Sequence, residues 1–116
     1  MSWNIYFCDP VSRETIELDE PHFMHGGTYC LGGTRELWMN ITYNYAKNYS
    51  PHGFCVDDLH GKTAVDIIPE LERVIAALGD DIDSDYWKPT DGNAKRALMS
   101  VLAMAKMRPD ALIRVS

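Results

Sequence analysis

Residues 92–107 carry the sequence pattern that most constrains what this chain can fold into. Small and apolar side chains recur there at helical spacing, and three methionines widen the apolar side: Met99, Met104 and Met107. The remaining polar arc is narrow, consisting of Lys95, Arg96, Ser100 and Lys106. Thr90 or Asp91 is placed to cap the start, and Pro109 stops the helix. A helix this apolar needs cover on most sides, so we expect it to be the central one.

Two other segments show helical spacing. Residues 35–48 follow Thr34, a good N-cap, and place an apolar stripe at Leu37, Trp38, Ile41 and Tyr45. Residues 66–78 form the other predicted helix, which Gly79 ends. Pro69 is tolerated in the first turn of a helix, which favours Asp66 over Thr63 as the N-cap.

The ends of the chain have strand character. Residues 3–8 and 14–18 alternate apolar and polar side chains around Asp9-Pro10, which predicts a β-hairpin. Residues 111–115 indicate a last strand, and residues 28–31 and 54–56 are short candidates. The prediction is therefore an α+β fold, with a small antiparallel sheet packed on about three helices. A length of 116 residues suits one domain, 1–116.

Charge excludes some classes of function. The chain has 11 Lys and Arg residues against 17 Asp and Glu residues, a formal net charge of −6. Non-specific binding of nucleic acid or anionic membranes needs a basic surface, so neither is expected. The sequence has no apolar run of membrane-spanning length and no signal-peptide pattern at its start, so we expect a cytoplasmic protein. An acidic surface fits instead a basic groove on another protein.

The candidate chemistries for a metal or a nucleophile are weak. Three widely spaced cysteines, Cys8, Cys30 and Cys55, make no disulfide framework. His22 and His25, and His52 and Cys55, have ligand-like spacing, but neither pair is a two-cysteine zinc knuckle. The aspartates at 81, 83 and 85 start like a calcium loop, yet the required glycine and final glutamate are missing. We therefore predict no metal and no cofactor, and keep a small Cys/His enzyme only as a third hypothesis.

The glycine-rich turns are the first candidate binding element. Gly26, Gly27, Thr28 and Tyr29 precede Gly32, Gly33 and Thr34, which open onto the predicted helix N-terminus. Backbone N–H groups at a helix start attract anions. No P-loop and no dinucleotide fingerprint is present, so the glycines serve either as turns or as a site for a nucleotide-like ligand.

Aromatic and asparagine side chains form the second candidate. Asn40, Tyr43 and Asn44 lie on the predicted helix at 35–48, although Asn and Tyr are mediocre helix formers. Tyr86 and Trp87 lie in an Asp-rich loop spanning residues 80–91. Aromatic side chains with convergent polar groups are typical of binding surfaces. The alternative is that the aromatic residues are core and the asparagine row is solvated.

These same segments carry a resemblance. In Gly26–Tyr29, Gly32–Thr34 and 38–45, and again near Trp87, Gly92–Ala94 and Met107–Asp110, the chain resembles small uncharacterised proteins of bacterial and prophage genomes. The resemblance implies a mobile-element or accessory context and supplies no catalytic residue.

The leading functional hypothesis is a non-enzymatic binding protein of phage or mobile-element type. It engages a host protein, as an inhibitor for example, through residues 80–87, the Asn/Tyr segment or both. The alternative is a protein that binds or sequesters a small nucleotide-like ligand with the glycine-rich turns and Tyr43.

Overall fold

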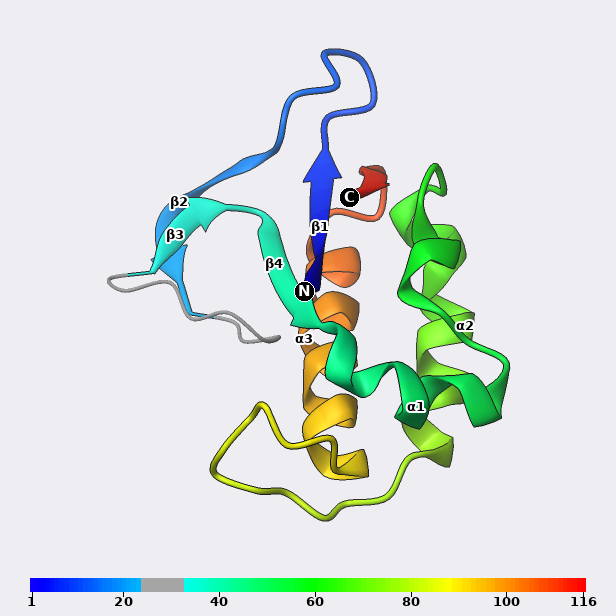
Figure 1. The fold of residues 1–116 in the computed structure, drawn as a ribbon. Helices are drawn as coiled ribbons and strands as arrows, with labels where there is room; N and C mark the ends of the chain where they lie inside the picture. Colours follow the sequence, from blue (N-terminus) through cyan, green and yellow to red (C-terminus); the bar gives the residue numbers. More distant parts are fainter. Residues whose placement is uncertain (24–32) are drawn as a thin grey trace.

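β1 (Ser2–Cys8) is the middle strand of the main sheet (Figure 1). The computed structural model describes residues 1–23 and 33–116 of the chain. Within these residues, β1 pairs antiparallel with β4 (Trp38–Thr42) on one side and β5 (Leu112–Val115) on the other. Trp3, Ile5 and Phe7 of β1 are buried, as their alternation predicted.

Two long helices complete the core. α2 (Ala64–Ala77) and α3 (Asp91–Met107) lie side by side, and α3 runs behind β1 in the view of Figure 1. The α3 side chains that enter the core are Ala94, Ala97, Leu98, Val101, Met104 and Ala105. None of the helices in the described ranges is long and apolar enough to cross a membrane. The predicted α+β class is confirmed, and so are the last helix and the last strand.

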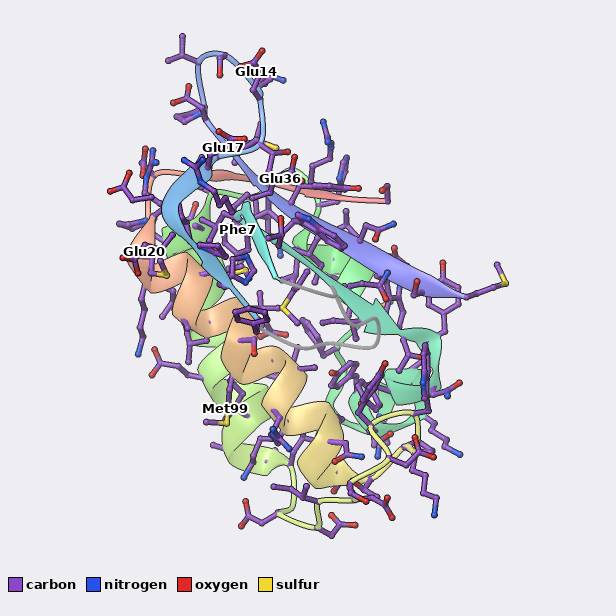
Figure 2. All side chains as sticks on the ribbon, turned by 90° about the vertical axis from the view of Figure 1, so that its left-hand side faces the viewer. Phe7, Glu14, Glu17, Glu20, Glu36 and Met99 are labelled. Carbon is purple, nitrogen blue, oxygen red and sulfur yellow. The ribbon has the colours of Figure 1, made fainter. Side chains whose placement is uncertain are left out.

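The predicted hairpin forms only at its turn. The Asp9 N–H donates to Glu14 O at 2.8 Å, and the Ile16 N–H donates to Phe7 O at 2.9 Å. Beyond Ile16 the chains separate, because β4 occupies that edge of β1. The chain instead continues as β2 (Glu17–His22), which pairs with β3 (Thr34–Glu36) in a separate two-stranded ribbon. Figure 2 shows Glu17, Glu20 and Glu36 on this exposed, acidic ribbon.

The prediction of a helix over residues 35–48 is wrong. This stretch forms β3, then β4, then a 3₁₀ turn η1 (Tyr43–Tyr45) and the short helix α1 (Ala46–Tyr49). Residues 39–42 of β4 are all buried, so no period-two alternation marks the strand. Leu37, Ile41 and Tyr45 are buried as predicted, but their helical spacing is a coincidence of three different local structures.

Two details of the predicted helices are also corrected. α2 begins at Ala64, two residues earlier than predicted, because the Ala64 and Val65 N–H groups donate to backbone carbonyls at Ala111 and Pro109. Thr63 is therefore the N-cap, and Pro69 lies beyond the first turn on the exposed side. On α3, Met99 and Met107 are exposed, so the core side of this helix is narrower than predicted. Figure 2 shows Met99 pointing outward.

Short 3₁₀ helices form the connection between α1 and α2. η2 (Ser50–His52) ends at Gly53, whose φ of 67° is left-handed. η3 (Val56–Leu59) follows, in place of the short strand predicted at 54–56. Phe54, Val56 and Leu59 are buried, so this connection still contributes to the core.

Replacing Asn40 by alanine should change the free energy of unfolding in opposite directions for the observed strand and for the predicted helix. Asn40 Nδ2 donates to Ser2 Oγ at 2.7 Å and to Asn4 Oδ1 at 2.9 Å, from a buried position. Asn40→Ala should lower the free energy of unfolding by about 1–3 kcal/mol, because its partly buried partners Ser2 and Asn4 lose their hydrogen bonds. On an exposed helix the same change would stabilise by up to ~0.7 kcal/mol.

Urea unfolding of Asn40→Ala, Asn4→Ala and the double variant measures this. We expect a coupling free energy of about 0.5 kcal/mol or more between the two positions, as contacting residues show. Independent, additive effects would contradict the cross-strand contact.

Candidate functional site

The acidic loop, residues 79–90, connects α2 to α3 and lies against the segment Tyr43–Tyr49 (Figure 1). It is the yellow-green to yellow loop at the bottom of that view. It carries four aspartates, at positions 80, 81, 83 and 85, and has no regular secondary structure. Because the loop lies outside helices and sheets, its backbone N–H and C=O groups need hydrogen-bond partners from side chains or from other segments.

Side chains of the Tyr43–Tyr49 segment supply many of those partners. Asn44 Nδ2 donates to Trp87 O at 2.8 Å, and the Tyr45 hydroxyl donates to Tyr86 O. Asn48 Nδ2 donates to Pro89 O at 3.1 Å and to Asp91 Oδ1 at 2.9 Å. One turn further, the Tyr49 hydroxyl donates to Ala94 O at 2.8 Å. The segment therefore holds the loop and the start of α3 by a row of side-chain donors.

The hydroxyl groups of Tyr45 and Tyr49 remain hydrogen-bond donors over a wide pH range. Burial raises the pKa of Tyr45 to about 12, against an ordinary value of 10.0. Burial also raises the pKa of Tyr49 well above that value. Both hydroxyls therefore stay protonated at any physiological pH and donate to their carbonyl partners.

Asn93 fastens the loop from the other side. It is buried at the third position of α3, and its N–H donates to the Oγ1 of the N-cap Thr90. Its Oδ1 accepts from the Asp83 N–H at 3.1 Å, and its Nδ2 donates to Asp85 O and Lys88 O. Both N–H groups of the side-chain amide and its oxygen thus bond to the loop backbone.

The aspartates complete the loop's own structure. Asp83 Oδ1 accepts from the Asp85 N–H at 2.8 Å, and Asp85 Oδ1 accepts from the Trp87 N–H at 3.1 Å. These are consecutive Asx turns, in which an aspartate side chain closes the turn that follows it. Two ion pairs, Lys88 with Asp83 and Lys95 with Asp80, neutralise part of the charge. The loop is therefore an internally bonded element rather than a solvated linker.

What the loop leaves outside is an acidic and aromatic face. Trp87 is 45% exposed and Ile82 is 57% exposed. Nearby, Tyr43 is half-exposed, and its ring packs edge-on against Trp3 with a centroid separation of 4.6 Å. A shallow depression of about 490 Å³ opens here, lined by Tyr43, Asn44, Ala46, Lys47 and Pro89.

Apart from Gly33 and Thr34, the predicted site residues divide into three groups. Asn44, Tyr86 and Trp87 come together in the loop contact, with Tyr43 at its edge. Asn40 is buried between strands and does not belong to the loop contact. The third group lies outside the described residues: Gly26, Gly27, Thr28, Tyr29 and Gly32.

Gly33 and Thr34 have structural explanations. Gly33 has a φ of +77°, and a Cβ there would lie 2.9 Å from His22 O and the Phe23 ring. Thr34 pairs with His22 across the β2–β3 ribbon and does not cap a helix. The helix N-terminus to which an anion was predicted to bind is therefore absent at Thr34.

The cysteine and metal hypotheses gain no geometry from the described part of the chain. Cys8 is buried, and burial raises the pKa of the Cys55 thiol, which disfavours the reactive thiolate. In residues 1–23 and 33–116, no three His, Cys, Asp or Glu side chains are grouped to hold a metal ion. His25 and Cys30 lie outside those residues.

Sequence reasoning missed Gly92 and Asn93 as parts of this site. It had Tyr45 and Asn48 in the Asn/Tyr segment, with core and binding surface left as alternatives. A signal was available in Thr90-x-x-Asn93, the spacing of a helix cap and its third residue. No spacing connects residues 44–49 with 86–94, because that contact is tertiary. Comparison with models of protein families, curated proteins and solved structures gave no match.

Gly92 tests how closely the loop is packed on α3. A Cβ at Gly92 would lie 2.7 Å from the Asp81 carbonyl carbon and oxygen, so the loop backbone would have to move. We expect Gly92→Ala to lower the free energy of unfolding by about 1–3 kcal/mol through overpacking. This loss should appear although alanine favours a helix over glycine by about 1 kcal/mol.

Gly79→Ala is the matched control at the other end of the loop. A Cβ there would make contacts of 3.4–3.5 Å, and its φ is not left-handed. Thermal or urea unfolding should show a change within about 0.5 kcal/mol. Equal losses for both variants would contradict the close packing at Gly92.

Asp91 reports the Asn48 contact through its titration. The hydrogen bond from Asn48, with a second from the Gly79 N–H, lowers the pKa of Asp91 below the ordinary 3.8. A lowered pKa gives stability that is present above pH 3.8 and is lost as the pH falls through the folded-state pKa.

Asn48→Ala should therefore raise the pKa of Asp91 toward 3.8 and weaken the acid dependence of stability. Carboxyl-detected NMR titration measures it. Asp110, whose pKa is lowered by Arg108, is the internal control and should not change. An Asp91 titration identical in both proteins would show that Asn48 does not hold the carboxylate.

Proposed function

We propose that this is a non-enzymatic binding protein of phage or mobile-element type, which engages a host protein through the acidic loop. Trp87 is the anchor, Tyr43 and Ile82 extend the apolar contact, and Asp81 and Asp85 supply charge. One observation carries the proposal: the loop's backbone is hydrogen-bonded inside the molecule while its aromatic and acidic side chains remain outside.

Preorganisation is the physical reason to favour this face. A disordered loop loses conformational entropy when it binds, whereas a loop already fixed by Asn44, Tyr45 and Asn93 has little left to lose. A half-exposed tryptophan on a fixed backbone is the kind of side chain that dominates binding energy at interfaces. The depression beside Tyr43 and Lys47 gives room for a side chain of the partner.

The expected partner is a basic protein surface. Besides Asp80 and Asp83, which have lysine partners, the loop displays Asp81 and Asp85 at exposed positions. Opposite charge accelerates the encounter and sets orientation more than it adds affinity. Binding should therefore weaken as salt rises.

The alternative, a nucleotide-like ligand on the glycine-rich turns, gains no specific support from Gly33 and Thr34. The third hypothesis, a Cys/His enzyme, gains no support from Cys8, which is buried, or from Cys55, whose thiol pKa is raised by burial.

Capture from host cell extract with quantitative mass spectrometry tests the proposal. Wild-type protein is compared with Trp87→Ala, which removes the anchor, and with Asp81→Lys, which reverses one exposed charge. We expect one host protein to be enriched by the wild type and reduced at least about tenfold by Trp87→Ala, the loss typical of an interface anchor. Asp81→Lys should reduce its capture to a smaller extent, because an exposed charge contributes more to the encounter than to affinity.

Glu72→Lys is the matched control, because it changes net charge equally at an exposed position on α2. It should capture as the wild type does. If every captured protein responds to Glu72→Lys as it does to Asp81→Lys, or to neither loop variant, the proposed surface is wrong.

A further inference from the structure

A second concave region lies at the end of the molecule opposite the acidic loop. It has a volume of about 430 Å³ and is lined by Cys8, Arg13, His60, Leu112, Ile113 and Arg114. These residues come from the end of β1, the turn after it, the η3 exit and β5, which gather at the top of Figure 1. The lining contains no acidic side chain, although the whole protein has a net charge of −6.

The two arginines that line this cavity, Arg13 and Arg114, have no acidic partner among the described residues. The ion pairs found in the described part of the chain involve Arg73, Lys88, Lys95 and Arg108, but neither Arg13 nor Arg114. Arg114 is positioned over the Tyr6 ring, 4.6 Å from its centroid. Two like charges on one cavity repel each other unless an anion lies between them.

The acidic side chains nearby belong to a separate groove. Glu14, Glu17 and Glu36, labelled in Figure 2, line that groove, to which Arg13 and Arg114 also contribute. Arg13 and Arg114 thus line both the acidic groove and the cavity without acidic side chains. Neither guanidinium forms an ion pair with the acidic side chains of the groove, whereas Arg108 pairs with Asp110.

His60 adds a directed donor. The Val115 N–H donates to His60 Nδ1 at 3.0 Å, so this nitrogen accepts and carries no proton. The neutral ring therefore bears its hydrogen on Nε2. A backbone hydrogen bond thus fixes both the ring orientation and the tautomer that can donate to a ligand.

The turn that presents Arg13 is unusual and rigid. Arg13 has a φ of 67°, and among the described residues it is the one non-glycine with a positive φ. Asp9 holds the turn: its Oδ1 accepts from the Val11 and Ser12 N–H groups at 2.9 Å, and its carbonyl accepts from the Arg13 N–H. A residue held in a disfavoured conformation by its surroundings is a reason to look for a function there.

We propose that this cavity binds a small molecule through a phosphate group, held by Arg13, Arg114 and His60. A phosphate dianion balances the charge of two guanidiniums, and its oxygens accept from guanidinium and imidazole N–H groups. The volume falls in the range of small-molecule sites and exceeds what phosphate alone occupies. The Leu112, Ile113 and Cys8 wall is apolar, so the remainder of the ligand is an uncharged organic body.

Titration of ¹⁵N-labelled full-length protein with phenyl phosphate and with inorganic phosphate tests this, with sodium chloride at equal ionic strength as the reference. Saturable shifts are expected at the amides of Arg13, Gly61 and Arg114, which lie around the cavity. Phenyl phosphate should bind more tightly than inorganic phosphate, because its ring contacts the apolar wall.

The variants are Arg13→Asn, which keeps a residue tolerant of positive φ, and Arg114→Gln. Each should weaken binding about tenfold or more, as expected for the loss of a charged hydrogen-bonding partner. Arg73→Gln, at an ion-paired arginine on α2, is the control and should bind as the wild type does.

Three results would overturn the site: no saturable shift with either phosphate, equal shifts with chloride, or unchanged affinity in Arg13→Asn. Equal affinity for phenyl and inorganic phosphate would overturn the organic-body part. If Arg114→Gln unfolds through loss of its Tyr6 contact, Arg13→Asn alone decides, since its side chain is exposed.

Discussion

The hydrogen bonds from Asn44, Tyr45 and Asn48 to the carbonyls of residues 86–89 connect two parts of the chain that are far apart in sequence. On one side of this contact, η1 and α1 continue directly from β4, the strand paired with β1. On the other side, the loop leads into α3, whose apolar side chains make up much of the core. The same row of donors therefore links the segment that follows β4 to the exposed loop and to the start of α3.

This arrangement explains the odd composition of residues 40–49. Asparagine and tyrosine are mediocre helix formers, but their side chains are good hydrogen-bond donors. Tyr45 and Tyr49 fill the core with their rings, and their hydroxyls donate hydrogen bonds to the carbonyls of Tyr86 and Ala94. Side-chain donors from this segment satisfy carbonyl groups of the loop, whereas Asp83 and Asp85 accept from N–H groups of the loop itself.

Much of the fold could be predicted from local pattern, and particular residues show where this fails. α3 and β5 were predictable because their apolar spacing is regular and their caps are local: Thr90 at one end, Pro109 after the other. β4 was mistaken for a helix because it is buried on both sides, so that Leu37, Ile41 and Tyr45 mimic a helical stripe. The hairpin was right at Asp9 and wrong beyond Ile16, because pairing with β4 outcompeted it.

The candidate site was only half predictable for a similar reason. The sequence singled out Tyr86 and Trp87 as exposed anchors and Asn44 as a polar group worth attention. It did not join them, since residues 44 and 87 meet only through tertiary packing. Asn40, chosen from the same row, proved to be a cross-strand donor, which periodicity cannot distinguish from a surface residue. The cavity at Arg13 and Arg114 likewise combines the two ends of the chain and leaves no mark in either segment.

Hydrogen exchange of the Asp83, Asp85 and Trp87 amides tests most directly the claim that hydrogen bonds fix the backbone of the acidic loop. The account predicts protected amides in the wild type and exchange faster by about two- to tenfold in Tyr45→Phe, the loss expected for one hydrogen bond. Exchange of these amides at unprotected rates in the wild type would contradict it.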